Sequence, residues 1–160
     1  MAPHPPASAA HRLGRKMIEF WTTADNIPAV PGAYVLVIKL YEPVMASIGR
    51  KPPAPLAAGE YLYCGSARGS GGLRGRLTRH MRHGKSIRWH IDSLTESGTV
   101  LGAWTFPGGS ECDLVTSLSH LPIAVEGFGS SDCRKCASHL LRWPHGAGTL
   151  IPKGIAFEVM

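Results

Sequence analysis

The sequence predicts a mixed α/β (α+β) domain, in which a small, mainly antiparallel sheet of three strands is flanked by helices. The chain has 160 residues, of which 44% are hydrophobic and 18% are charged, as is typical of one compact domain. Segments rich in β-branched and aromatic residues alternate with segments whose apolar residues recur at helical spacing. Clusters of Gly and Pro separate these segments. A small sheet covered by helices buries both kinds of apolar surface.

The strands are expected at three places. YVLVIKLY (34–41), YLYCGSA (61–67) and TVLGAWTF (99–106) have the composition of buried strands. Between the first two, residues 42–60 are rich in Pro and Gly, which argues against regular structure there. We therefore expect the first two strands to form a hairpin that carries a long, stiff, Pro-rich insertion.

Helices are expected after each Gly-rich or Pro-rich break that follows a strand. The expected helices are residues 73–83, a short helix from Ser86, a helix from Ser110 and a last helix over 132–143. The apolar positions that should face the core are Leu73, Leu77 and Met81 on the first, Ile87, Ile91 and Leu94 on the second, and Leu114, Leu118 and Leu121 on the third.

The expected domain organisation has three parts. Residues 1–14 are rich in Pro, Ala and His and are expected to form a flexible tail, 15–143 the domain proper, and 144–160 a C-terminal extension. The first segment lacks the apolar run of a signal peptide, and nowhere do about eighteen apolar residues follow one another. We therefore expect a soluble, cytoplasmic protein that does not enter a membrane.

The charge distribution is the strongest indication of function. Between Glu60 and Asp92 the chain has no carboxylate, in a protein with a net charge of +6 and a pI near 9.4. A basic helix with an apolar face would hold its cations on a rigid surface suited to a polyanion. The candidate nucleic-acid-binding residues are Arg68, Arg74, Arg79, Arg82, Lys85 and Arg88. Of these, Arg79 and Arg82 are expected to point outward and to contact the phosphate backbone without reading bases.

Short motifs on the expected elements resemble those of a nuclease superfamily. These are Gly32-Ala33-Tyr34 on the first strand, Tyr63-Cys64-Gly65 on the second, Arg76 and His80 on the basic helix, and Glu111 at the head of a later helix. Together they resemble the GIY-YIG nucleases. The phrases GLRGRLTRH, RWHIDSL and GFGSSDC resemble one branch of that superfamily, the DUF123 domains, which are sometimes joined to DNA repair enzymes.

The resemblance implies an endonuclease that hydrolyses phosphodiester bonds in DNA with one divalent metal ion, Mg²⁺ or Mn²⁺. It implies that Glu111 is the only protein ligand of that ion. Tyr34 or Tyr63 would lie beside the attacking water, and Arg76 and His80 would stabilise the pentavalent phosphate. A phenol acts as a base only if nearby cations lower its pKa, and the basic segment is expected to supply them. The implied partners are DNA, with RNA as an alternative, and a repair protein; the chain is expected to act as a monomer.

Two departures from the family pattern leave catalysis open. Tyr34 and Tyr63 lie 29 positions apart because of the Pro-rich insertion, which a surface loop can accommodate. The polar Asn that often follows the metal-binding Glu has no clear counterpart, although Ser130, Ser131 and Asp132 are candidates. One alternative is therefore a nucleic-acid-binding module of the same fold with weak or lost catalysis.

A further alternative is a zinc or redox protein built on Cys133, Cys136 and His139. The chain has four cysteines, and two of them form a C-x2-C pair, which is half of a structural zinc site. Cys64 and Cys112 stand alone in the sequence, and nothing in the pattern brings either to the pair. From sequence we therefore expect Cys133 and Cys136 to be reduced, metal-free and packed near the start of the last helix.

Overall fold

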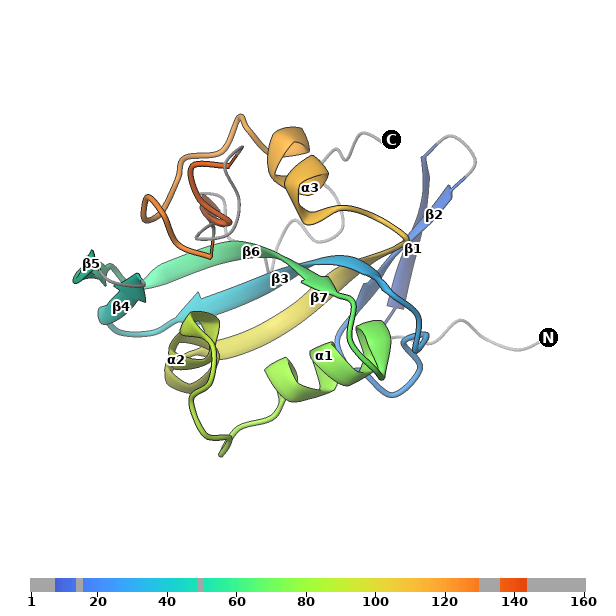
Figure 1. Ribbon diagram of the computed structural model, residues 1–160, viewed down its shortest axis with the longest axis horizontal. Coiled ribbons are helices and arrows are strands. Elements are labelled where there is room, and N and C mark those ends of the chain that lie inside the picture. The colour runs from blue at the N-terminus through green and yellow to red at the C-terminus, as the bar shows by residue number, and fades with distance from the viewer. Residues whose placement is uncertain (1–7, 14–15, 49–50, 130–135, 144–160) are drawn as a thin grey trace.

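The structure is a computed structural model that describes residues 8–13, 16–48, 51–129 and 136–143 (Figure 1). Its main sheet has six strands in the order β1-β2-β7-β3-β6-β8, and all neighbouring strands are antiparallel. The strands are β1 (Ser8–Leu13), β2 (Lys16–Trp21), β3 (Gly32–Leu40), β6 (Gly59–Ala67), β7 (Thr99–Pro107) and β8 (Leu140–Trp143). The helices are α1 (Gly72–Met81), α2 (His90–Ser97) and α3 (Glu111–Ser117).

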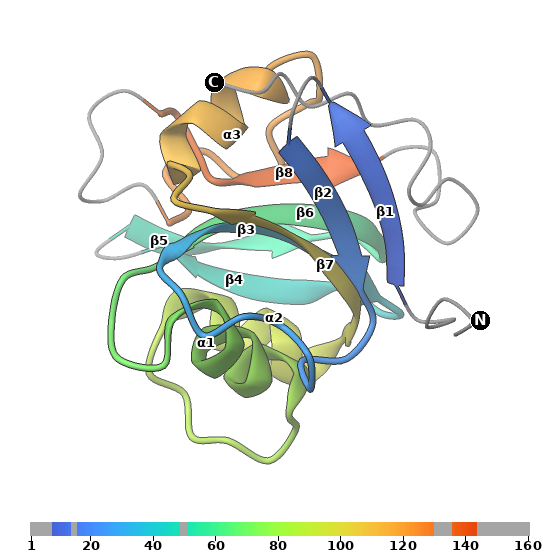
Figure 2. The ribbon, with the colours of Figure 1, turned by 90° about the vertical axis from the view of Figure 1, so that its right-hand side faces the viewer.

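Helices cover both faces of the sheet: α1 and α2 lie on one face and α3 on the other (Figure 2). Side chains of β3 therefore alternate between two hydrophobic layers. Leu36 and Ile38 pack in the layer that contains Leu73 and Leu77 of α1. The intervening residues of β3, such as Val35, pack in the layer that contains Leu114 and Leu118 of α3. Burial on both faces explains why this strand is almost continuously apolar in sequence.

The mixed α/β character and the antiparallel sheet predicted from sequence are confirmed, but the predicted number of strands is wrong. β3 lies between β6 and β7, so the three expected strands form the centre of the sheet. β1 and β2 extend it on one side, and β8 extends it on the other. Residues 8–13 therefore form a strand within the expected tail 1–14, because β2 offers them a free edge for backbone pairing.

The Pro-rich insertion 42–60 was expected to be irregular, and this is wrong. It forms a separate two-stranded sheet of β4 (Val44–Ile48) and β5 (Lys51–Leu56). Ala46, Ile48 and Leu56 are buried against the same layer as α2, which gives the hairpin an apolar anchor. Because each of these two strands has an unpaired edge, β5 can contain prolines, which lack an N–H to donate.

The helices differ from expectation mainly at their ends. α1 is confirmed, and so is α3, whose Ser110 Oγ accepts a hydrogen bond from the Asp113 N–H at 3.4 Å. α2 begins at His90 and not at Ser86, and the side chain of Ile87 is 59% exposed. The expected last helix is also wrong where it is described, because its end forms β8. No helix in the described ranges is long and apolar enough to span a membrane.

Candidate active site

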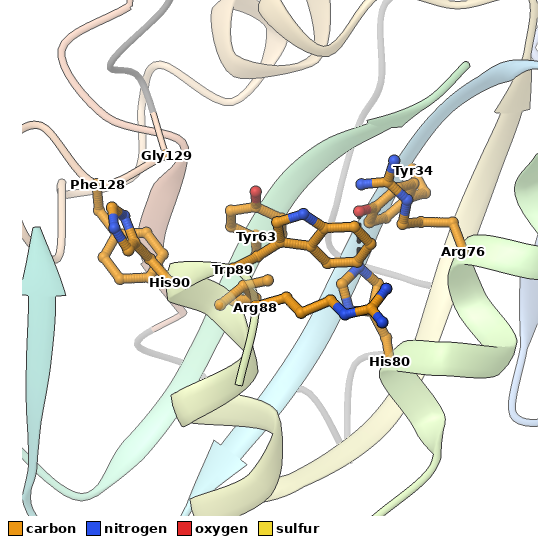
Figure 3. Close-up of a pocket in the computed structure, with 10 residues that line it drawn as sticks. Tyr34, Tyr63, Arg76, His80, Arg88, Trp89, His90, Phe128 and Gly129 are labelled. Atoms are coloured by element: carbon orange, nitrogen blue, oxygen red, sulfur yellow. Dashed lines mark hydrogen bonds between the residues drawn. The ribbon is translucent and has the colours of Figure 1, made fainter. Parts of the chain in front are cut away.

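An open pocket of about 250 Å³ lies where β3, β6 and α1 meet the segment that leads into α2 (Figure 3). It is lined by Tyr34, Tyr63, Arg76, His80, Arg88, Trp89, His90, Ile91, Phe128 and Gly129. Four of the five residues that the family resemblance assigned to catalysis therefore share one pocket, although they come from three separate elements.

Tyr34 lies at the back of this pocket and is almost fully buried. Its hydroxyl oxygen lies 2.7 Å from Nε2 of His80, which joins the central strand to α1 through a buried hydrogen bond. The ring passes over Gly65, the residue opposite Tyr34 on β6. A Cβ atom at position 65 would collide with the Tyr34 ring, so the pairing of Tyr34 with Gly65 is a steric requirement.

The pKa values of both pocket tyrosines are raised, contrary to expectation. Burial raises the pKa of Tyr34 well above its ordinary value, and the neighbouring Tyr63 and Glu111 raise it further. Burial, followed by Glu111, raises the pKa of Tyr63 to about 12. Arg76 acts in the opposite direction on both, but its charge does not outweigh their loss of hydration. Both phenols are therefore protonated at neutral pH.

His80 is the neutral partner of Tyr34. Burial, followed by repulsion from Arg76, lowers the pKa of His80 to about 3. The side chain is 1% exposed, and its Nδ1 has no hydrogen-bond partner within the described ranges. The imidazole is thus uncharged at neutral pH, and its Nε2 can either accept a hydrogen bond from the Tyr34 hydroxyl or donate one to it, depending on the tautomer.

The lowered pKa of His80 should make the folded protein less stable in acid. In the unfolded chain this histidine takes up a proton near its ordinary pKa of 6.5, whereas the folded protein takes it up only near 3. The unfolded state therefore binds more protons between these values, so stability is full above the upper value and is lost as pH falls toward the lower one. We expect the free energy of unfolding of His80→Asn to depend less steeply on pH than that of the wild type, by up to roughly 1 kcal/mol per pH unit.

Urea denaturation at several pH values between these limits measures that slope. His120→Gln is the comparison variant, because it removes an exposed histidine in place of a buried one. Equal slopes for His80→Asn and the wild type would show that His80 is not held neutral by burial.

Arg76 is held in the pocket by an aromatic residue that the sequence analysis did not single out. Its guanidinium carbon lies 4.2 Å from the centre of the Trp89 ring, and that of Arg79 lies 4.7 Å from the same ring. Trp89 is 37% exposed, so part of its surface is available to a ligand. The sequence signal for this residue was an aromatic side chain between cations in RWH, which is a pattern of nucleic-acid-binding surfaces.

Glu111 is the fifth predicted catalytic residue, and it stands beside the pocket without lining it. It is the first residue of α3, and its side chain is 30% exposed. Its charge is close enough to contribute to the raised pKa values of Tyr34 and Tyr63. Its carboxylate oxygen Oε2 also lies 3.8 Å from Nδ1 of His139.

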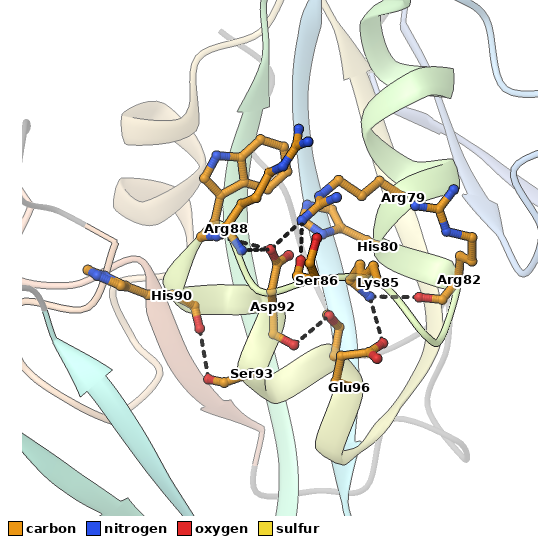
Figure 4. Close-up of polar contacts among 12 residues, drawn as sticks. Arg79, His80, Arg82, Lys85, Ser86, Arg88, His90, Asp92, Ser93 and Glu96 are labelled. Carbon is orange, nitrogen blue, oxygen red and sulfur yellow. Dashed lines mark hydrogen bonds and ion pairs between the residues drawn. The ribbon is translucent and has the colours of Figure 1, made fainter.

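Two of the predicted nucleic-acid contacts instead take part in a polar network within the protein, where Arg79 is half-buried and Lys85 is buried (Figure 4). Arg79 donates to Oδ2 of Asp92 at 2.5 Å and to the Ser86 carbonyl at 3.0 Å, so the expectation that it points outward is wrong. Lys85 is 8% exposed and donates to Glu96 and to the Arg82 carbonyl. Asp92 and Glu96, the first acids after the acid-free segment, attract these two cations inward.

The other basic candidates lie at the surface. Arg68, Arg74, Arg82 and Arg88 are exposed. Arg88 also lines the pocket, whereas the Nε of Arg74 donates to the Ile27 carbonyl at 2.7 Å. Of the basic residues predicted for the site, these four, with Arg76 at the pocket, are the ones that a polyanion can reach.

The structure adds Cys112 to two potential metal ligands that the sequence analysis had grouped, Cys136 and His139. One ligand atom each of Cys112, Cys136 and His139 lies within 4.8 Å of the others. The expectation that Cys112 would stay apart from the C-x2-C segment is therefore wrong, because α3 starts close to the chain that leads into β8. Cys133 lies outside the described residues, as do Ser130, Ser131 and Asp132.

Comparison with known proteins identifies the family but no relative. The model of the family described as "Domain of unknown function DUF123" matches residues 33–151. No curated protein and no solved structure matches the chain. The matched segment contains all the pocket residues and the group of Cys112, Cys136 and His139. It also covers well over half of the sequence, and the chain therefore belongs to the DUF123 family.

Proposed function

We propose that this protein is a divalent-metal-dependent endonuclease with the GIY-YIG fold, which hydrolyses phosphodiester bonds in DNA during repair or processing. The observation that supports this most directly is the convergence of Tyr34, Tyr63, Arg76 and His80 on one open pocket. Two phenols, an imidazole and a guanidinium can together bind a phosphate and position an attacking water.

Arg76 is the phosphate-binding group of this proposal. A guanidinium can give two parallel hydrogen bonds to phosphate oxygens, and packing on Trp89 fixes its plane before the substrate arrives. In the pentavalent transition state the same oxygens carry more charge, so Arg76 stabilises the transition state more than the ground state.

Tyr34 and His80 position the attacking water. Because the pKa of Tyr34 is raised, this phenol does not act as a phenolate at neutral pH. Its hydroxyl can donate to Nε2 of neutral His80, across a hydrogen bond that is already formed, and accept a hydrogen bond from the attacking water. The proton of the water leaves to solvent, because His80, with a pKa of about 3, is too weak a base to take it up. Tyr63, with its pKa near 12, serves as a hydrogen-bond donor at the pocket wall.

Glu111 would hold the divalent ion, Mg²⁺ or Mn²⁺. Its partly exposed carboxylate is a hard oxygen ligand, and these ions often keep several waters and take few protein ligands, so the donor set fits. When bound, such an ion would supply positive charge for the scissile phosphate and the leaving oxygen.

Nucleic acid is the favoured substrate because charge and aromatic surface coincide. The exposed part of the Trp89 ring offers a contact for one base. Arg88 at the pocket and Arg82 at the end of α1 are placed to contact the neighbouring backbone. RNA shares the phosphates and the bases, so DNA and RNA are to be compared directly.

A cleavage assay tests the proposal. Purified protein is incubated with branched, nicked and single-stranded DNA, and with RNA of the same sequence, in Mg²⁺ or Mn²⁺. We expect nicks in DNA that appear only with metal. Binding without cleavage on every substrate would favour the second candidate, a nucleic-acid-binding module with weak or lost catalysis. The raised tyrosine pKa values are the observation that favours this alternative.

The exposed cations should contribute affinity without sequence preference. We expect the double variant Arg82→Ala/Arg88→Ala to weaken binding to all DNA sequences alike and to lower the slope of log affinity against log salt by about two. Arg142→Ala is the control, since Arg142 is exposed on the edge strand β8, does not line the pocket and should change the slope little. If the double variant kept the wild-type slope of log affinity against log salt in a binding titration, DNA would not contact Arg82 and Arg88.

A further inference from the structure

The group of Cys112, Cys136 and His139 lies outside the proposed catalytic pocket. Cys112 belongs to the first turn of α3, whereas Cys136 and His139 belong to the segment just before β8. Their ligand atoms all lie within 4.8 Å of one another. In a tetrahedral zinc site, sulfur and nitrogen ligands are about 3.3–3.8 Å apart, as follows from the usual bond lengths. Shifts of roughly 1 Å would therefore close the group around one ion.

The buried ring of His139 gives the clearest indication that this group binds a ligand. Its side chain is 1% exposed, yet neither Nδ1 nor Nε2 has a hydrogen-bond partner within the described ranges. The nearest carboxylate oxygen, of Glu111, is 3.8 Å from Nδ1, which is too long for a hydrogen bond. Leaving a buried polar group without a partner is unfavourable, and coordination of a metal removes that cost for one ring nitrogen.

The chemistry of the three ligands selects zinc. Two sulfurs and one imidazole suit Zn²⁺, whereas Mg²⁺ and Mn²⁺ prefer the oxygen of a carboxylate such as Glu111. A disulfide between Cys112 and Cys136 would leave His139 buried and unsatisfied, so redox pairing explains less of the geometry. Binding converts both thiols to thiolates and releases two protons to solvent.

We infer that Cys112, Cys136 and His139 bind one Zn²⁺ ion that fastens the start of α3 to the chain entering β8. This inference does not depend on nuclease activity. α3 has only seven residues, and Glu111 immediately precedes Cys112. A zinc ion would therefore fix the position of Glu111 beside the pocket through Cys112, its neighbour in sequence.

Metal analysis of the purified full chain tests the inference. The protein is produced with zinc in the medium, purified without chelators, and its metal is measured by mass spectrometry; we expect about one zinc per chain. Cys112→Ser, Cys136→Ser and His139→Gln should each lose most of it. His120→Gln is the matched control for His139→Gln, because His120 is an exposed histidine outside the group, and this variant should keep its zinc.

A second measurement holds even if the variants fail to fold. Wild-type protein is stripped with a chelator and reloaded with Co²⁺, whose absorption spectrum reports tetrahedral geometry and thiolate ligation. We expect thiolate-to-cobalt charge transfer, and a higher melting temperature on addition of Zn²⁺ but not of Mg²⁺. Wild-type protein that carries no zinc and gives no thiolate-cobalt spectrum would overturn the inference. Zinc retained at the wild-type level by both Cys136→Ser and His139→Gln would also overturn it.

Discussion

Replacing Glu111 by Gln is expected to lower DNA cleavage by at least about a hundredfold while DNA binding stays within a few-fold of wild type. The substitution keeps the size of the side chain and removes its charge, so the metal ion loses its protein ligand. Single-turnover cleavage and equilibrium binding, measured on the same DNA in Mg²⁺, separate the two effects. Zinc content is measured alongside, because Glu111 adjoins Cys112, and a variant that has lost zinc would not isolate the carboxylate.

Arg76→Ala is expected to give a loss of the same size, for a different reason. It removes the guanidinium that neutralises the phosphate in the transition state, and it leaves the exposed cations in place. Arg74→Ala is the matched control on the same helix, since Arg74 is exposed and does not line the pocket. Wild-type rates in metal-supplied Glu111→Gln or in Arg76→Ala would refute the assignment of that residue.

Replacing Asp92 by Ala is expected to cost about 3 kcal/mol of stability. Burial disfavours the charged carboxylate of Asp92, but hydrogen bonds from the Trp89 and Arg88 N–H groups and from Arg79 hold its pKa below the usual range. Oδ2 accepts these bonds at 3.0, 2.8 and 2.5 Å. Without Asp92, the first turn of α2 loses its cap, and Arg79 is left as a largely buried cation without its partner.

The free energy of unfolding from urea titrations measures this cost. Asp25→Ala is the control, because Asp25 is exposed and should lose well under 1 kcal/mol. A loss for Asp92→Ala as small as that of the control would mean that the network around Arg79 does not stabilise the fold.

The sequence predicts the centre of the fold better than its edges. β3, β6, β7 and α1 are recognisable because they are buried, and burial imposes apolar periodicity on the sequence. β8 has only four residues, and its strand character comes from pairing with β6 and not from its own composition. The start of α2 was misplaced because Ser86 resembles a cap, whereas the capping carboxylate belongs to Asp92, inside the helix.

The candidate site likewise has features that the sequence predicted and features that it could not predict. The family resemblance predicted that Tyr34, Tyr63, Arg76 and His80 act together, and the structure brings them to one pocket. The direction of their pKa shifts could not be predicted, because it depends on how much hydration each group loses. The burial of Arg79 and the approach of Cys112 to Cys136 depend on contacts between distant segments, which no local pattern records.

The strand order also determines when the sheet can be completed during synthesis. β1 and β2 are synthesised before the other strands, but the inner edge of β2 pairs with β7. The backbone of Trp21 therefore cannot pair until Ala103 has been synthesised. β3 likewise emerges long before β7 can cover its second edge. Such non-local pairing slows folding and leaves apolar strand edges open while the chain is incomplete. The second edge of β6 stays open still longer, because its partner β8 ends at residue 143, so open strand edges persist until well after β7 has been synthesised.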